Sequence, residues 1–126
     1  MTATASTREA GRARHIDGQL AESSVARHYA GQGHAVAARR WRSPSGEIDL
    51  VVRTPDEIVF VEVKKAATCA AAAFRLGARQ IERLCAAATD FLAGEPAGLG
   101  TAMRFDLALV DRFGRVEVIE NAFGAA

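Results

Sequence analysis

The sequence lacks any apolar run close to the roughly 18–20 residues that a membrane-spanning helix requires. Residues 1–15, MTATASTREAGRARH, also lack the apolar centre that marks a secretory signal peptide. Both absences argue against insertion into a membrane and against export. We therefore expect a cytoplasmic protein without a membrane partner.

Cysteine is scarce, with only Cys69 and Cys85 in a chain of 126 residues. Their spacing fits neither a zinc site nor a disulfide framework. Cys85 lies in an Ala-rich apolar segment, so we expect its side chain to be small, apolar and buried. Internal repeats are absent too, and a chain of this length builds one hydrophobic core rather than two. We predict a single domain over residues 17–126 after a disordered basic tail, residues 1–16.

Charge of one sign does not dominate the chain, whose formal net charge is +1. That balance neither requires nor excludes a nucleic-acid partner. The basic residues are clustered, however, in the tail (Arg8, Arg12, Arg14, His15) and around Trp41 (Arg39, Arg40, Arg42). Such clusters are either solvated surface or contacts for phosphate groups, because local charge matters more than the total.

Residue periodicity predicts the order α-β-β-β-α-β-β. A helix is expected from Asp17, as its N-cap, to Gly31 or Gly33. The other expected elements are an edge strand over 34–41, two strands within 46–65 that turn at 54–56, a helix over 71–93, and strands over 102–110 and 115–123. A strand, a long helix and another strand fit a crossover between parallel strands. The expected fold is α/β, a mixed sheet flanked by helices.

The segment GEIDLVVRTPDEIVFVEVKK carries charges inside strands that otherwise read as apolar. If its two strands pair through the short turn, Asp49 and Glu62 lie near each other on one face. Two such carboxylates repel, and a divalent cation such as Mg²⁺ removes the repulsion because it prefers oxygen ligands. Lys64 projects toward the same place, where its ammonium could orient a water or neutralise a phosphate oxygen. Glu47 is expected to face solvent.

These charges also have plainer explanations. Glu62 and Lys64 are spaced like a salt bridge at a solvated end of the sheet. Glu22 lies on the apolar side of its helix, three and four residues before Val25 and Ala26. A carboxylate there pairs either with a metal-bound water or simply with an arginine. Pattern alone leaves these alternatives open.

The combination of motifs resembles a known family. The segments AESSVARHYAGQGHAV, ARRWRSPSGEIDL, VFVEVK, RQIERLCAAATDFL and RFDLALV occur in this order. Together they resemble the YraN-like family of small bacterial proteins, which belongs to the restriction-endonuclease-like, or PD-(D/E)XK, superfamily. The likeness covers nearly all of the predicted domain. It implies a restriction-endonuclease-like fold with a central mixed sheet.

The resemblance also implies roles for individual residues. Asp49 matches the first metal-binding acid of the superfamily, and Glu62 and Lys64 match its (D/E)XK pair. Glu22 matches the acid of the first helix, and Gln80 the polar residue of the following helix. In active members of the superfamily these residues bind Mg²⁺, or Mn²⁺ in its place, and hydrolyse phosphodiesters. The implied metal ligands are Asp49, Glu62, the Val63 carbonyl and Glu22.

Some residues depart from the family pattern. Ala21 replaces a usual Gly, Arg40 a usual Asn, and Arg79 a frequent Lys, while Ala66 and Ala67 stand where relatives often carry basic residues. None of these changes removes a metal ligand. The expected nucleic-acid contacts are Arg40, Trp41, Arg42, Lys65 and Arg79.

Three classes of function follow from this sequence. The leading hypothesis is a metal-dependent nuclease acting on DNA rather than RNA. The second is a non-catalytic nucleic-acid-binding accessory protein of recombination or repair. The third is a protein-interaction domain in which the charged residues form an ion-pair network. A domain this small often needs a second subunit to grip a duplex, so a homodimer is one expectation for its assembly.

Overall fold

The computed structural model describes residues 18–73 and 76–123, so the predicted tail and the predicted N-cap Asp17 lie outside the described residues. A helix covers residues 18–31. The elements that follow are β1 (Ala35–Ser43), β2 (Gly46–Arg53), β3 (Ile58–Lys65), α2 (Cys69–Ala73), α3 (Ala78–Leu92), the 3-10 helix η1 (Gly98–Gly100), β4 (Met103–Val110) and β5 (Val116–Ile119).

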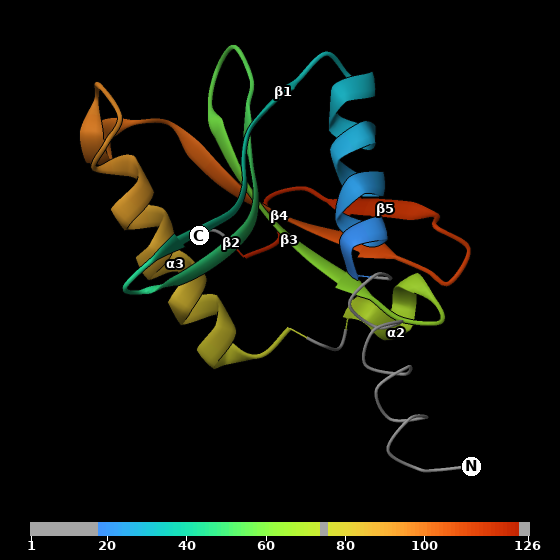
Figure 1. Cartoon of the computed structure of the whole chain (residues 1–126). Coiled ribbons are helices and arrows are strands. Elements are labelled where there is room, and N and C mark those ends of the chain that lie inside the picture. The colour runs from blue at the N-terminus through green and yellow to red at the C-terminus, as the bar shows by residue number, and fades with distance from the viewer. Residues whose placement is uncertain (1–17, 74–75, 124–126) are drawn as a thin grey trace, which may run out of the picture.

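The strands form one open mixed sheet in the order β1-β2-β3-β4-β5. β3 and β4 are parallel, and the other neighbouring pairs are antiparallel. The chain reaches β4 from β3 through α2 and α3, as Figure 1 shows, so the predicted crossover between parallel strands is confirmed. The predicted edge position of the arginine-rich strand is confirmed as well, because β1 ends the sheet.

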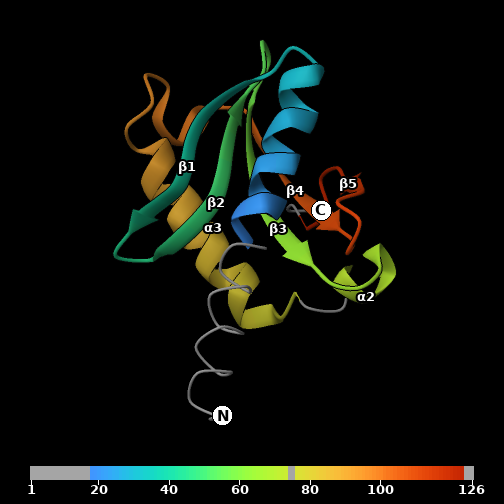
Figure 2. The same cartoon turned by 45° about the vertical axis from the view of Figure 1, so that its right-hand side comes forward.

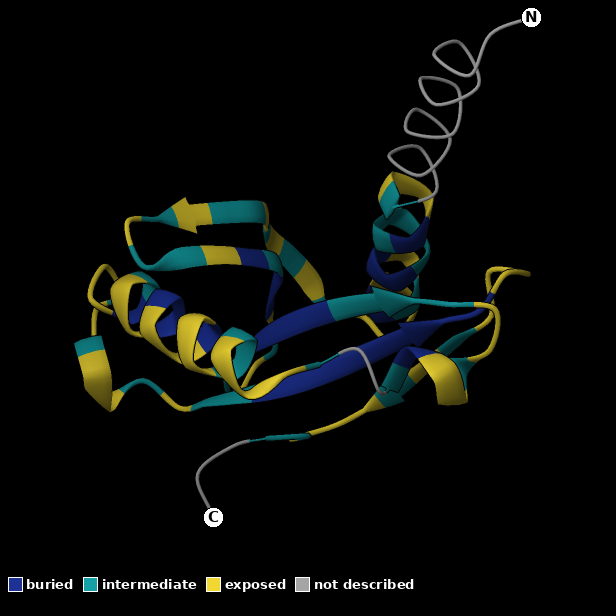
Figure 3. Cartoon of the chain, turned by 90° about the horizontal axis from the view of Figure 1, so that it is seen from below, coloured by how far each residue is buried: buried dark blue, intermediate teal, exposed yellow. Residues whose placement is uncertain are grey.

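Helices cover both faces of the sheet. The helix over residues 18–31 packs on one face against side chains of β2, β3 and β4, and α3 packs on the other. Seen from below, the central strands are buried between these layers, while the outward side of α3 is exposed (Figure 3). In the part of the chain that the structure describes, no helix is long and apolar enough to cross a membrane.

The single helix predicted over residues 71–93 is wrong, because the structure divides it. α2 ends at Ala73, and α3 begins after Gly77, whose backbone is extended (φ −101°, ψ 164°). Glycine is accepted at such an N-cap position, and its low helix propensity favours a break there. The break sends the two helices to different parts of the sheet. Ala72 of α2 packs on Leu107 and Leu109 of β4, while α3 covers β2 and β3.

The prediction that Cys85 is buried is also wrong. Cys85 is exposed on α3, although the residues around it in sequence are small and apolar. The buried side of α3 carries Leu84, Ala87, Ala88 and Leu92. Cys85 follows Leu84 by one position, and one helical step turns a side chain by about 100°. An Ala-rich composition hid which side of the helix faces the sheet.

β2 and β3 fork apart at one end of their ladder. Their pairing runs from Arg53 and Ile58 to Leu50 and Val61, and it stops there. Beyond that point β2 stays paired with β1, and this hairpin bends over α3, while β3 continues beside β4 (Figures 1 and 2). Strict alternation therefore fails in β2. Alternation would place Ile48 on the same face as Leu50, but Ile48 packs in the α3-side cluster and Leu50 packs with the first helix.

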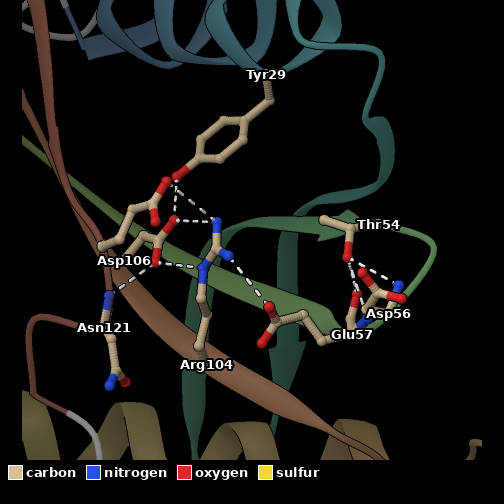
Figure 4. Close-up of polar contacts among 8 residues, drawn as sticks. Tyr29, Thr54, Asp56, Glu57, Arg104, Asp106 and Asn121 are labelled. Carbon is tan, nitrogen blue, oxygen red and sulfur yellow. Dashed lines mark hydrogen bonds and ion pairs between the residues drawn. The ribbon is translucent and has the colours of Figure 1, made fainter.

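A buried polar network ties the first helix to the sheet. Asp106 of β4 is fully buried, and it accepts a 2.7 Å hydrogen bond from the Tyr29 hydroxyl. Arg104 donates to both oxygens of that carboxylate, and the Asn121 backbone donates to one of them (Figure 4). Burial, and then Asp106, raise the pKa of Tyr29 well above its usual value, so the phenol remains a neutral donor. Arg104 also reaches Glu57, which follows the Thr54 turn.

Candidate functional site

The two acids predicted to form a site lie at the fork. Asp49 precedes Leu50 and Glu62 follows Val61, so each acid is the first residue beyond the paired ladder. The Asp49 carboxylate accepts a 2.8 Å hydrogen bond from the Val63 N–H. A side chain therefore bridges the two strands where the backbone ladder with β2 has ended. The fork brings the two carboxylates together, as the sequence predicted.

Glu62 is the buried member of the pair, with 5% of its surface exposed. Its Oε1 accepts a 3.0 Å hydrogen bond from Gln80 and lies 3.4 Å from the Lys64 ammonium. Burial raises the pKa of Glu62 to about 8, neighbouring Asp49 raises it further, and Lys64 offsets only part of the shift. Burial thus makes it costly to ionise Glu62, so without a further cation its carboxyl group favours the protonated form.

The plainer explanation for Glu62 and Lys64 was a salt bridge at a solvated end of the sheet. The ion pair exists, but its side chains are only 6% and 17% exposed. A second carboxylate, that of Asp49, raises the pKa of Glu62 by its charge. A surface ion pair needs neither the burial nor the second acid. The surroundings therefore differ from those of a solvated surface pair.

Glu22 approaches the same place from the first helix. It contributes to the wall of a cavity of about 340 Å³ that opens over the fork and is lined by Gly18, Ala21, Glu22, Asp49, Glu62, Val63, Lys64 and Lys65. The Glu22 carboxylate is held by Arg40, whose Nε lies 3.0 Å from Oε2. Within residues 18–73 and 76–123, no group of three or more His, Cys, Asp and Glu side chains is close enough to hold a metal ion. Glu22 is across the cavity from the acid pair and is engaged by arginine.

Two further cavities adjoin the site. One, of about 560 Å³, lies on the α3 side and is lined by Gly46, Glu47, Gly77, Arg79, Gln80, Arg83 and Leu84. Gln80 connects it to the acid pair, because its amide binds Glu62. The other cavity, of about 380 Å³, is lined by Gln19, Glu22, Ser23, Arg39 and Arg40. Arginines thus flank the site on both sides.

The remaining residues expected to contact nucleic acid have mixed environments. Trp41 is partly buried, and its ring packs edge-on against Phe91 with centroids 5.2 Å apart. Arg42 is mostly exposed and lies 3.5 Å from Glu47, which is itself exposed as predicted. Lys65 contributes to the wall of the cavity over the fork. Lys65 therefore lies at the site, Arg42 lies beside Glu47 of the α3-side cavity, and Trp41 packs against the apolar core beside α3.

Sequence reasoning missed Arg83 and the Asp106 network. Arg83 follows Arg79 by one helical turn, so the i, i+4 spacing in RQIER places both on one face. Arg104 and Asp106 alternate with apolar residues in the strand that was predicted over residues 102–110. Charges in an apolar strand had pointed to Asp49 and Glu62, and the same signal could have found Asp106.

Comparison with known proteins places this arrangement in a family. The model of the family described as "Uncharacterised protein family UPF0102" matches residues 21–110, which is more than half of the chain. The chain belongs to the UPF0102 family. The resemblance to the YraN-like family is thereby confirmed. The match to UPF0102 contains Glu22, Asp49, Glu62, Lys64 and Gln80, so every predicted catalytic residue lies within it.

Individual relatives match over most of both chains. A UPF0102 protein of Cereibacter sphaeroides (strain ATCC 17023) is 58% identical over 115 residues, covering 91% of this chain and 98% of the relative. A UPF0102 protein of Ruegeria pomeroyi is 57% identical over 110 residues, covering 87% and 89%. One of Dinoroseobacter shibae is 43% identical over 106 residues, covering 84% and 79%. The UPF0102 likeness therefore covers most of this chain and most of each relative.

Proposed function

We propose that this protein is a metal-dependent nuclease with a restriction-endonuclease-like fold, which hydrolyses phosphodiester bonds in nucleic acid, in DNA rather than RNA. The observation that carries the proposal is the placement of Asp49 and Glu62 at the fork, with Lys64 and Gln80 on Glu62. Two acids and a lysine on rigid strands, beside arginine-lined cavities, suit a reaction on a phosphate diester.

The donor set fits a Mg²⁺ or Mn²⁺ ion. Carboxylate and carbonyl oxygens are the ligands that these hard cations prefer, and Asp49, Glu62 and the Val63 carbonyl would supply them. Burial and then Asp49 raise the pKa of Glu62, and a bound cation would offset both effects by stabilising the ionised carboxylate. When bound, the ion would supply Lewis-acid chemistry, activating water and stabilising charge on the phosphate.

The protein's own residues orient the reactants. Gln80 holds one oxygen of Glu62, which fixes the carboxylate toward the cavity. The Lys64 ammonium lies beside Glu62 and is placed to neutralise a phosphate oxygen or to orient the attacking water. Glu22 faces the same cavity from the first helix, where Arg40 binds it, so its contribution is expected to be the smallest of the three acids.

A non-catalytic nucleic-acid-binding protein is the second candidate. The observation that favours it is the ion pair between Arg40 and Glu22, which engages the third acid of the predicted metal site. In that case the arginines of the two flanking cavities would bind phosphates, and the acid pair would only shape the fold. Metal binding and cleavage distinguish the two candidates.

Replacing Asp49 with asparagine is expected to weaken Mg²⁺ or Mn²⁺ binding by about a hundredfold. Loss of a residue that only holds a metal ligand in place already lowers metal affinity roughly 10–100-fold, and Asp49 is itself a proposed ligand. Isothermal titration calorimetry of the full-length protein measures the affinity. Glu47→Gln is the matched control, since Glu47 lies two residues away on the same strand but is exposed. Unchanged binding by Asp49→Asn would rule out the proposed ligand set.

Cleavage is tested with plasmid, single-stranded and branched DNA and with RNA, each with Mg²⁺ or Mn²⁺ and with a chelator. We expect DNA products that require the metal and that disappear in Asp49→Asn. Salt-sensitive binding without products from any substrate would favour the binding protein instead. Products that persist in Asp49→Asn would come from a contaminating nuclease.

The arginines of α3 give a separate prediction about binding. Removing both Arg79 and Arg83 is expected to weaken binding to all DNA sequences alike and to reduce the slope of log K against log salt by about 2, one unit for each lost phosphate contact. Anisotropy titrations at several salt concentrations, with a chelator present, measure the slope. Arg53→Gln is the control, because Arg53 lies at the opposite end of β2 from the fork. An unaltered slope in the α3 variant would exclude this cavity as a phosphate site.

A further inference from the structure

The turn between β4 and β5 presents an aromatic ring to solvent. Phe113 has 69% of its surface exposed, whereas the other described Phe, Tyr and Trp side chains are buried or partly buried. Two guanidinium groups lie over its ring, with the Arg112 carbon 4.9 Å and the Arg115 carbon 5.6 Å from the centroid. Phe113 makes no part of the core and was not among the residues assigned to the site.

The turn that carries this ring is well fixed. The buried carboxylate of Asp111 accepts hydrogen bonds of 2.8 and 2.9 Å from the backbone N–H groups of Phe113 and Arg115. Asp111 and Arg115 also join through the backbone, and Gly114 takes the left-handed conformation (φ +80°) that lets the chain turn back into β5. The ring is thus held outward by the turn rather than left on a loose loop. A preorganised aromatic side chain loses little entropy when it binds a flat partner.

The turn lies at the same end of the sheet as the acid pair. Lys65 of β3 is opposite Val110 of β4, and the segment that leaves β3 is hydrogen-bonded to the turn through the Arg112 N–H and the Ala67 carbonyl. The turn and α2 are neighbours in both views of the fold (Figures 1 and 2). From strand spacing and chain reach, the Cα atoms of Lys64 and Phe113 are at most about 19 Å apart.

We propose that Phe113, with Arg112 and Arg115, is a stacking platform for an unpaired base of nucleic acid. A base presents a flat aromatic face, and its strand carries phosphates that the two guanidiniums attract. Within a duplex these faces are covered by neighbouring base pairs, so the platform selects single strands, overhangs and frayed ends. This inference rests on the proposed function in that it names the substrate class of the same site, and it places the stacked base beside the scissile phosphate rather than on it.

An acidic protein surface is the other partner that two arginines attract, but it does not use the exposed ring. The charges at the turn do not by themselves select a partner, because Arg112 and Arg115 face Asp111, which lies 4.0 Å from Arg115, and Glu117, which lines the cavity beside the turn. The exposed ring lies between cations, where a base can stack on it. A partner that binds only through charge gains nothing from the ring.

The test measures binding of the full-length protein to labelled single-stranded and blunt duplex oligonucleotides with a chelator present. Phe113→Ala is expected to weaken single-strand binding about tenfold, within the range found for loss of one base–aromatic stack, and to leave duplex binding almost unchanged. Phe113→Tyr should bind like the unaltered protein, and Phe113→Leu like the alanine variant. Leu99→Ala is the control, since Leu99 is as exposed (70%) and precedes β4 at the other end of the sheet.

A base analogue reports stacking directly. An oligonucleotide that carries 2-aminopurine should lose fluorescence on binding the unaltered protein and the tyrosine variant, and should not do so with Phe113→Ala. Equal single-strand affinity of Phe113→Ala and the unaltered protein would overturn the platform, as would full retention by Phe113→Leu. If an abasic strand bound as tightly as a strand with bases, the platform would also be overturned, because binding would then depend on the phosphates alone.

The two proposals fail differently. Stacking without metal-dependent cleavage would refute the nuclease and keep the platform. Cleavage that is lost in Asp49→Asn but has the same single-strand preference in Phe113→Ala would keep the nuclease and refute the platform.

Discussion

Replacing Glu62 with glutamine is expected to abolish metal-dependent cleavage while stabilising the metal-free protein. The loss follows because a ligand is removed from an ion worth several kcal/mol to the reaction, so cleavage should fall by about a thousandfold or more. The gain follows because burial beside Asp49 opposes ionisation of Glu62 in the folded state, whereas the neutral amide keeps the shape of the side chain without that penalty. Few substitutions in a core are expected to have these two effects together.

The stabilisation should depend on pH in a defined direction. In the folded, metal-free protein the pKa of Glu62 is raised from 4.5 to about 8, chiefly by burial. Between these values the folded state holds a proton that the unfolded state has released, so the unaltered protein loses stability as pH rises through this window. The glutamine variant avoids that loss. Its advantage should be near zero below pH 4.5, grow by about 1.4 kcal/mol for each pH unit of the window, and level off above pH 8.

Thermal or urea unfolding in chelator, at several pH values, measures this difference. Glu47→Gln is again the control, because Glu47 is exposed and lies outside the acid pair. Adding Mg²⁺ or Mn²⁺ should raise the melting temperature of the unaltered protein and leave the Glu62 variant unmoved. A Glu62→Gln protein that is less stable than the unaltered one at pH 9 would show that the carboxylate is satisfied by Lys64 and Gln80 alone.

Replacing Asp106 with alanine is expected to cost about 3–5 kcal/mol of folding free energy, the usual result of removing one member of a buried ionic network. The change leaves the Tyr29 hydroxyl without its acceptor and takes both carboxylate contacts from Arg104. Arg104 would retain Glu57 at 3.1 Å and Glu120 at 3.7 Å. Urea unfolding followed by circular dichroism measures the loss.

Two milder variants apportion that loss. Tyr29→Phe removes one hydrogen bond to a charged acceptor and should cost about 2 kcal/mol. Glu120→Ala touches the exposed end of the network, where Glu120 is 66% exposed, and should cost less than about 0.5 kcal/mol. If Glu120→Ala were as damaging as Tyr29→Phe, the network would be organised by the surface acid rather than by Asp106.

The network connects stability to the proposed site. Tyr29 lies on the helix that also carries Glu22, and Asp106 belongs to the strand beside β3. The bond between them fixes how that helix rests on the sheet, two turns from the Glu22 carboxylate. A Tyr29→Phe protein that stays folded is therefore a useful background in which to measure whether helix placement affects metal affinity.

The local features of the fold could be predicted from the sequence. Alternation identified β2, β3 and β4, and the Thr54–Asp56 segment identified the turn, because these signals depend on neighbours in the chain. The boundaries of the helices were harder to predict from the sequence. An Ala-rich stretch has high helix propensity throughout, so only Gly77 marked the break, and Cys85 was placed on the wrong side of α3.

The sequence by itself determined the strand order along the chain, the family, and the choice of Asp49, Glu62 and Lys64 as charges out of place in apolar strands. Only the tertiary structure decided that these charges meet where β2 and β3 fork, that Arg40 engages Glu22, and that Arg83 joins Arg79 at an adjoining cavity. The reason is physical. Periodicity records which face a residue occupies on its own element, whereas the end of a ladder, a bend over α3 and a buried ion pair arise from packing between elements far apart in sequence.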